Sequence, residues 1–225
     1  MIPWLRGNAP FPPVSNALRS PNGLLCAGGT LSPERLVEAY SHGIFPWFSQ
    51  GDPILWWSPD PRMVLFPEEL KVSRSLGKVV RRGVYETRFD TAFPEVMKAC
   101  AAPRDGQGGT WIVPQMVRAY TRLHELGFAH SAESWHEGAL VGGLYGVALG
   151  KVFFGESMFT RAADASKVAL VHLVGRLKAE GFRVIDCQQA TAHLASLGAR
   201  EIPRADFAKM LQESIQYPPT GGHWR

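Results

Sequence analysis

Three polar side chains lie at the ends of what the sequence predicts to be two neighbouring strands. Glu156 follows the apolar run Val152–Phe154, and Asp186 and Gln188 follow the apolar run Phe182–Ile185. Carboxylates and an amide at the carboxyl ends of adjacent strands, beside a helix start, are placed as site residues usually are in α/β layers. A side-chain amide cannot act as a base, but it can orient a reacting group and accept its hydrogen bond. Asp186 has a second interpretation as a simple cap of the next helix.

A helix must connect these two strands. The first strand ends at Gly155, and residues 157–166 show no strand alternation. Apolar residues then recur at the spacing of a buried helix face, namely Val168, Leu170, Val171, Leu173, Val174 and Leu177. The helix is expected to begin near Asp164 or Ser166 and to end at Gly181, which suits a left-handed C-terminal cap. The pattern therefore predicts a strand–helix–strand unit.

The remaining elements predict an α+β or α/β protein with two parts. A small Pro- and Trp-rich N-terminal domain would span residues 1–62, and a larger domain residues 63–225. Further helices are expected at 33–43, 90–102, 114–127, 192–197 and 204–212, and further strands at 63–66, 84–89, 128–135, 140–149 and 199–202. This order, with an antiparallel meander leading into the central unit, resembles the acyltransferase (GNAT) fold with a mixed, largely antiparallel sheet. Only the ends, 1–20 and 217–225, are expected to be loosely held.

The composition is that of an ordinary soluble globular protein, with 45% hydrophobic and 20% charged residues. No apolar run approaches the roughly 20 residues that span a bilayer, and no basic segment precedes an apolar one at the N-terminus, so we expect a cytoplasmic protein without a membrane partner. Cys26, Cys100 and Cys187 are odd in number and scattered, which predicts neither a disulfide framework nor a metal site. Strand alternation would turn Cys187 away from Asp186 and Gln188, as an inert buried thiol.

Two surface features suit a nucleic acid. The segment 71–88 carries six cations against a single acid, Glu86; five of the cations are candidate tRNA-binding residues, Lys71, Arg74, Lys78, Arg81 and Arg82. A solvated basic helix would give the same pattern. Trp47, Trp56 and Trp57 lie within eleven residues; they either pack in the core or offer a stacking face for a base.

The turn after the central strand lacks a cofactor signature. Coenzyme A enzymes of the GNAT fold hold the pyrophosphate on a Gly-rich turn at this position, but residues 158–164 contain no glycine. Without glycine the backbone cannot approach a pyrophosphate closely, so we expect no coenzyme A and no other cofactor.

Long and compositionally unusual strings resemble the bacterial leucyl/phenylalanyl-tRNA–protein transferases. The resemblance runs from about Pro21 to Leu211 and includes these segments: Gly43–Phe48, Leu55–Arg62, Gly109–Ile112, Gly142–Gly146, Phe154–Phe159, Ala165–Lys167 and Ile185–Gln188. It implies transfer of Leu, Phe or Met from aminoacyl-tRNA to the N-terminal Arg or Lys of a protein, which marks that protein for degradation.

The resemblance also implies roles for single residues. Asp186 and Gln188 would form the catalytic pair, with Glu156 beside the acceptor, where it could meet the cationic group. Trp47 and Trp111 would contact the terminal adenosine and the aminoacyl end. The pocket for the amino-acid side chain would include Leu144, Phe153 and Leu173, with Tyr120 and Ser157 as further substrate-binding residues. Some family members carry Met at the position of Leu144 and an aromatic residue at that of Leu173, so the pocket is expected to rank Leu and Phe differently.

Two rival functions fit parts of the same pattern. One is an acetyl-coenzyme A acetyltransferase on the same fold, and the other is a non-enzymatic RNA-binding protein that uses the Trp-rich and basic segments. Nothing in the sequence requires more than a monomer.

Overall fold

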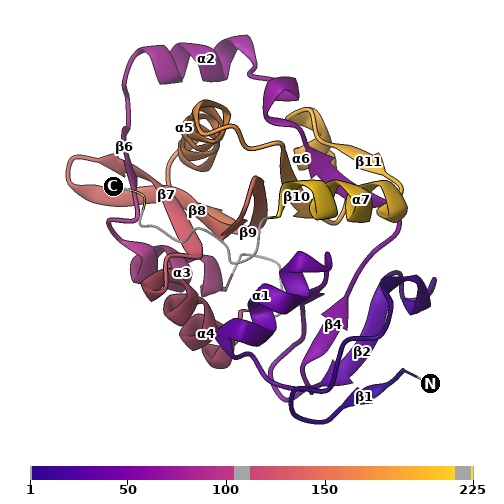
Figure 1. Cartoon of the computed structure of the whole chain (residues 1–225). Coiled ribbons are helices and arrows are strands. Elements are labelled where there is room, and N and C mark those ends of the chain that lie inside the picture. The colour runs from indigo at the N-terminus through magenta and orange to yellow at the C-terminus, as the bar shows by residue number, and fades with distance from the viewer. Residues whose placement is uncertain (1, 104–111, 216–223, 225) are drawn as a thin grey trace.

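A seven-stranded sheet forms the centre of the molecule (Figure 1). The computed structural model describes residues 2–103, 112–215 and 224. The strand order is β11-β5-β10-β9-β8-β7-β6. In chain order the strands are β5 (Arg62–Leu65), β6 (Glu86–Phe89), β7 (Ala129–His136), β8 (Ala139–Leu149), β9 (Val152–Thr160), β10 (Val184–Gln188) and β11 (Arg200–Ile202). Among these described strands, only β9 and β10 pair in parallel. The prediction of a mixed, largely antiparallel sheet is confirmed.

A second, four-stranded sheet belongs to the N-terminal part of the chain. Its order is β1-β2-β4-β3, with β1 (Trp4–Leu5), β2 (Leu24–Gly28), β3 (Phe45–Pro46) and β4 (Leu55–Trp57). Helix α1 (Pro33–Ser41) begins as expected, because the Ser32 side chain accepts a hydrogen bond from the Arg35 backbone N–H. One buried cluster includes residues from both parts, such as Tyr40 and Tyr145, so the division at residue 62 stays a prediction.

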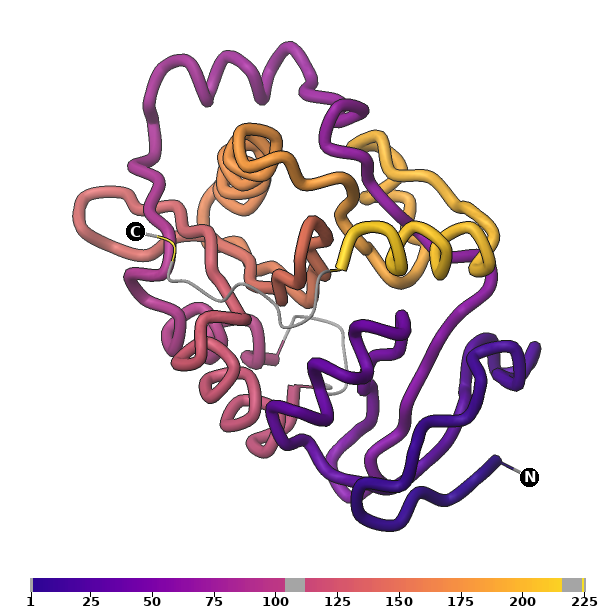
Figure 2. The backbone as a smooth tube through the Cα atoms, in the orientation of Figure 1, coloured from indigo at the N-terminus to yellow at the C-terminus, as the bar shows by residue number. Residues whose placement is uncertain are grey.

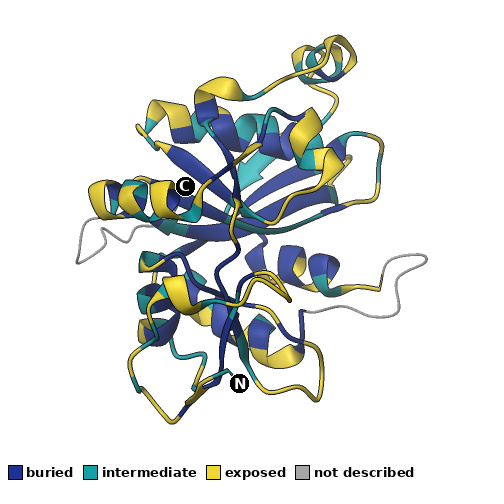
Figure 3. Ribbon diagram, turned by 90° about the vertical axis from the view of Figure 1, so that its right-hand side faces the viewer, coloured by how far each residue is buried: buried dark blue, intermediate teal, exposed yellow. Residues whose placement is uncertain are grey.

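Helices cover both faces of the large sheet. One face carries α3 (Phe93–Ala101) and α4 (Pro114–Glu125), with α1 against α4, and the other carries α5 (Ala165–Ala179), with α2 (Arg74–Arg81) outside it (Figures 1 and 2). The remaining helices are α6 (Ala192–Ser196), α7 (Arg204–Ser214) and two short 3-10 turns, Val14–Asn16 and Pro67–Glu69. Figure 3 shows the buried sheet between these layers. No helix in the described ranges is both long and apolar enough to cross a membrane.

The sheet separates two hydrophobic clusters. On β9 successive side chains alternate, so Phe154 packs with Leu36 and Met116 on the side of α1 and α4. Phe153 packs with Leu173 on the side of α5. The first part of β9, which precedes its polar residues, is therefore buried on both faces of the sheet.

Three expectations about local structure are wrong. Strand β9 does not end at Gly155 but continues to Thr160, because β8 pairs with it as far as Gly142 and satisfies its backbone groups. Strand β6 begins at Glu86 rather than at residue 84. The chain ends are not uniformly loose, since Leu5 and Trp224 are buried.

The strand–helix–strand unit predicted at the centre is confirmed, and it creates an opening. Strands β9 and β10 pair in parallel from Val152↔Val184 to Phe154↔Asp186. Beyond that point β9 stays with β8, while β10 stays with β5 through a register shift between Asp186 and Gln188. The two strands therefore separate where the polar residues begin, as strands do at ligand sites of many α/β sheets.

Candidate active site

A pocket of about 400 Å³ opens where β9 and β10 separate. Its apolar wall combines side chains from β8, β9, β10 and α5, including Leu144, Phe153, Leu170, Leu173 and Ile185. Its polar wall is formed by Glu156, Ser157, Gln188 and Thr191. A mostly apolar cavity with a few convergent polar groups is the usual form of a small-molecule site.

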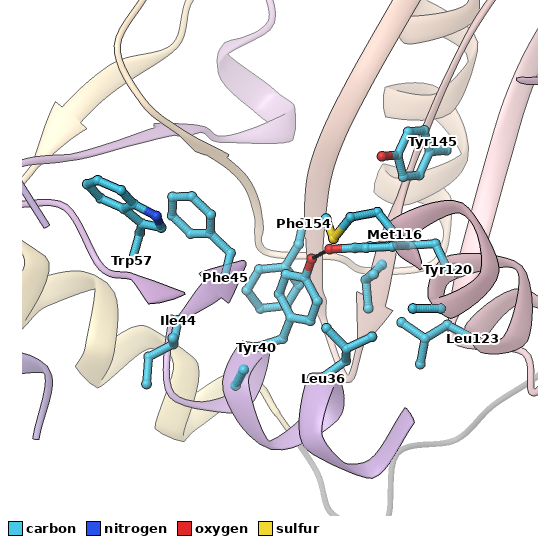
Figure 4. Packing of buried hydrophobic residues seen from close by; sticks show 14 of the residues in the cluster. Leu36, Tyr40, Ile44, Phe45, Trp57, Met116, Tyr120, Leu123, Tyr145 and Phe154 are labelled. Carbon is cyan, nitrogen blue, oxygen red and sulfur yellow. Dashed lines mark hydrogen bonds between the residues drawn. The ribbon is translucent and has the colours of Figure 1, made fainter. Parts of the chain in front are cut away.

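Glu156 is the centre of the polar wall. Its Oε1 accepts hydrogen bonds from the Tyr40 hydroxyl and the Gln188 amide Nε2, each at 2.7 Å. Its Oε2 accepts one from the Tyr120 hydroxyl at 3.2 Å. The two tyrosine hydroxyls, from α1 and α4, also hydrogen-bond to each other (Figure 4); because each hydroxyl carries a single proton, one of them shares its proton between the other hydroxyl and Glu156. Segments far apart in the sequence thus meet at one carboxylate.

Burial sets the protonation of this cluster. It raises the pKa of Glu156 to about 7, and the negative charge of Asp186 acts in the same direction, while the three donors oppose it. Burial also raises the pKa of Tyr40 and Tyr120 well above the usual value, and the charge of Glu156 adds to the effect. Both phenols therefore stay protonated and act as hydrogen-bond donors.

Asp186 lies behind the pocket and is completely buried. Arg62 binds it with two hydrogen bonds, Nε to Oδ1 at 2.8 Å and Nη2 to Oδ2 at 2.7 Å. The backbone N–H of Gln188 donates to Asp186 Oδ1 at 2.9 Å. The interpretation of Asp186 as a helix cap is wrong, because the Thr191 side chain caps α6. Asp186 contacts the backbone of Gln188 and not its side-chain amide.

Gln188 has a left-handed backbone conformation, with φ of 63°. Such a conformation is uncommon for a residue with a side chain and is stabilised by its surroundings. Here the Asp186–Arg62 pair fixes the backbone, and Glu156 fixes the side chain. In the structure the Gln188 amide Nε2 donates to Glu156 Oε1, which accepts it as a carboxylate oxygen. The amide Oε1 is then left to accept a hydrogen bond from a ligand.

The comparisons with known proteins identify the family of the chain. The family model described as "Leucyl/phenylalanyl-tRNA protein transferase" matches residues 64–212, and the model of its N-terminal domain matches residues 29–60. The chain belongs to the leucyl/phenylalanyl-tRNA protein transferase family.

Relatives match this chain along its whole length. Proteins named "Leucyl/phenylalanyl-tRNA--protein transferase" from Nitrosospira multiformis and Chromobacterium violaceum are 65% and 62% identical over 100% of this chain and over 97% and 96% of their own. The one from Stutzerimonas stutzeri is 59% identical over 100% of both chains. A solved structure of the C-terminal domain of a putative lysylphosphatidylglycerol synthetase from Agrobacterium fabrum is 13% identical, covers 88% of this chain and 74% of its own, and has a TM-score of 0.46.

Most of the substrate-binding residues expected for this transferase family member lie at or beside the pocket. Leu144, Phe153, Ser157 and Leu173 lie in its wall. Tyr120 lies behind the wall and reaches Glu156.

Of the two tryptophans expected to contact the tRNA end, the structure describes Trp47 but not Trp111. Trp47 is outside the lining of the pocket; it is 37% exposed, and its ring packs against Trp57 with centroids 5.3 Å apart. Trp111 falls outside the described residues.

Cys187 differs in part from the expectation. It was expected to turn away from Asp186 and Gln188, but it lines the same pocket as Gln188. Burial nevertheless raises the pKa of its thiol far above the usual value, and the charge of Asp186 adds to this. The inert character expected of Cys187 is therefore consistent with its surroundings.

Sequence reasoning missed Tyr40 and Arg62 as site residues. Tyr40 occupies an apolar helix face and looked like an ordinary core residue. Arg62 ends a Pro-rich string and looked like part of a domain boundary, but its side chain is buried between the rings of Phe45 and Phe207. A buried arginine needs a carboxylate partner, but the burial of Arg62 is visible only in the structure.

The five candidate tRNA-binding cations lie on one outer segment of the molecule. Lys71 precedes α2, Arg82 follows it, and Arg74, Lys78 and Arg81 lie on it; all five are exposed. In the parts of the chain that the structure describes, none of them forms an ion pair. The alternative of a simple solvated helix fits the same geometry.

Proposed function

We propose that this protein transfers Leu, Phe or Met from aminoacyl-tRNA to the N-terminal Arg or Lys of acceptor proteins in the cytoplasm, which marks them for degradation. We further propose that it acts as a monomer with an N-terminal domain (1–62) and a catalytic domain (63–225). The observation that carries the proposal is the juxtaposition, in a member of this family, of an apolar pocket and an amide in its lining that is held by a partly buried carboxylate.

The apolar wall suits the side chain of the transferred amino acid. Leu144, Phe153 and Leu173 offer shape and burial but no hydrogen-bonding group. Such a wall discriminates by only about 1–3 kcal/mol per methylene group. Acceptance of Leu, Phe and Met by one pocket follows from that small difference.

Gln188 is the group that orients the acceptor amine. Its free Oε1 accepts a hydrogen bond from the α-amino group, which directs the nitrogen lone pair at the ester carbonyl carbon. The C–N bond forms, the C–O bond to the ribose breaks, and one amine proton passes to the ribose oxygen or solvent. An α-amino group has a reference pKa of about 7.7–8.0, so a useful fraction is neutral and no strong base is needed. Holding amine and ester together supplies most of the acceleration.

Glu156 and Asp186 act by positioning Gln188. Glu156 already accepts three hydrogen bonds, from Tyr40, Tyr120 and Gln188. Asp186 is buried and holds the Gln188 backbone. Glu156 also adds negative potential near the acceptor, which favours a cationic N-terminal residue.

The tRNA would contact two exposed features. The cations of α2 and its flanks suit the phosphate backbone. Trp47 offers a partly exposed ring on which the terminal adenosine can stack.

A transfer assay tests the proposal and separates it from its rivals. Labelled Leu-tRNA is incubated with a peptide that begins with Arg or with a matched peptide that begins with Ala, and acetyl-coenzyme A is supplied as the alternative donor. Transfer from tRNA to the Arg peptide alone supports the proposal. Acetylation supports the acetyltransferase, and tRNA binding without transfer supports the RNA-binding protein.

The role of Gln188 has a matched control in its neighbour. Gln188→Ala is expected to lower kcat on the order of 10²-fold, because the amine loses its orientation. Gln189 is exposed and does not line the pocket, so Gln189→Ala should keep wild-type kcat. Equal activity of both variants would contradict the assignment of Gln188.

A further inference from the structure

Trp224, near the end of the chain, is part of the core behind the pocket. Its side chain is 7% exposed and belongs to the same hydrophobic cluster as Leu144, Phe153 and Leu173. Its ring stacks on His130, with centroids 4.1 Å apart and planes at 10°, and on Phe153, at 5.8 Å and 24°. A residue from a chain end thus packs against a wall of the pocket.

Strong local contacts fix the position of Trp224. Its backbone N–H donates to Asp90 Oδ2 at 2.9 Å, and Asp90 also contacts His130 Nδ1 at 2.8 Å. The Arg176 guanidinium lies 5.0 Å from the ring centroid, as expected for a cation–π contact. Phe89 and Phe182 meet the ring edge to face. The indole is therefore held from several elements.

Phe153 connects Trp224 to the pocket. It is 1% exposed and lines the pocket, whereas Trp224 does not. The ring of Phe153 also packs over Gly146 so closely that a Cβ there would lie 2.6 Å from it. With β8 on one side and Trp224 stacked behind it, Phe153 has little room to move away from a bound side chain.

We propose that Trp224 is a specificity-determining residue for the donor amino acid, which it controls by fixing the position of Phe153. This inference rests on the proposed function. Trp224 is a positioning residue, because it touches Phe153 and not the substrate. Removal of the indole leaves space behind Phe153, so the pocket deepens and the larger Phe side chain gains relative to Leu.

A competition assay tests this inference. Wild type, Trp224→Phe and Trp224→Ala each receive Leu-tRNA and Phe-tRNA in one mixture with the Arg-ended peptide, and the ratio of kcat/KM for Phe to that for Leu is measured. We expect Trp224→Ala to raise this ratio by more than about threefold. This change is smaller than the roughly 10- to 200-fold discrimination that one methylene group gives in an apolar pocket. Trp224→Phe keeps a stacking ring and should fall between wild type and Trp224→Ala. A smaller rise in Trp224→Ala, or a fall, overturns the inference.

Two controls separate specificity from stability. Val96→Ala removes a buried side chain from the other cluster, away from the pocket, and should lower stability without changing the ratio. In a Phe153→Leu background, Trp224→Ala should change the ratio no further, because the connecting ring is gone. Additive effects of the two changes would contradict action through Phe153. Transfer by wild type with an unchanged ratio in Trp224→Ala refutes only the role of Trp224, whereas no transfer by wild type refutes the proposed function as well.

Discussion

At the scale of single residues, the site is organised by Glu156 and not by Asp186 and Gln188 of β10. Glu156 connects Tyr40 of α1, Tyr120 of α4 and Gln188 of β10. Its pKa of about 7 results mainly from burial. A carboxylate that loses hydration and gains neutral donors is well suited to hold an amide in one orientation.

The raised pKa of Glu156 predicts a pH-dependent stability. The pKa rises from 4.5 to about 7 on folding. Between these two pH values Glu156 is therefore protonated in the folded protein and ionised in the unfolded chain. Glu156 therefore contributes stability below pH 4.5 that is lost as the pH rises to about 7. Glu156→Gln removes this contribution. Urea unfolding measures the free energy of unfolding of wild type and variant at each pH. The value for wild type should fall relative to that for the variant across this interval, and the difference should then become constant. A constant difference would contradict the shift.

Tyr40 and Tyr145 allow a controlled test of the hydroxyl contacts, because both are buried but only Tyr40 donates to Glu156. Tyr40→Phe removes a donor to Glu156, so stability should fall by about 1–3 kcal/mol and the pKa of Glu156 should rise further. The hydroxyl of Tyr145 is buried and has no hydrogen-bond partner among the residues that the structure describes. Tyr145→Phe should therefore be neutral or stabilising in the same denaturation experiment. Equal losses would contradict the hydrogen-bonding argument, because phenylalanine keeps the ring at both positions and only Tyr40 has a hydroxyl that donates to Glu156.

At the scale of elements, glycines let β8 approach its neighbours. A Cβ at Gly142 would lie 2.6 Å from the Cβ of Ala165, at the start of α5. The same close contact places α5, which carries Leu170 and Leu173, over the pocket. The distance between strand and helix thus sets the depth of the site.

Gly142→Ala and Gly175→Ala should change stability in opposite directions. Gly142→Ala forces β8 and α5 apart and should destabilise by about 1–3 kcal/mol. Gly175 is exposed inside α5, and a Cβ added there would meet no described atom within 4 Å. Gly175→Ala should stabilise by about 0.5–1 kcal/mol, because alanine has the higher helix propensity. Thermal unfolding of the two variants measures both changes in stability. Destabilisation of similar size in both would contradict the argument that β8 and α5 need a glycine at residue 142 to approach each other.

At the scale of the whole molecule, charge is concentrated away from the pocket. The exposed cations of α2 and its flanks lie outside α5, whereas the pocket opens where β9 and β10 separate. A long nucleic acid can contact both at once, while a small donor such as acetyl-coenzyme A cannot use the outer helix in the same way.

Charge reversal at one position of α2 tests this division. Lys78→Glu should raise the apparent Kd for tRNA severalfold and reduce the salt dependence of binding by about one unit of slope. Lys209, exposed on α7, provides a control of equal charge change. Lys209→Glu should have a smaller effect on both quantities. Equal effects of the two would indicate a general response to net charge and no specific surface.

The order along the chain of the strands in the large sheet, the strand–helix–strand unit and the three polar residues after its apolar runs could be predicted from the sequence alone. These features are local, because periodicity, caps and turn residues are set by neighbours along the chain. Only the tertiary structure decided that β9 continues past Gly155, since its hydrogen bonds come from β8. It also brought Tyr40 to Glu156, Arg62 to Asp186 and Trp224 to Phe153. Each of these pairs joins segments far apart in the sequence, and no local pattern encodes which buried polar or aromatic groups will meet when separate elements pack.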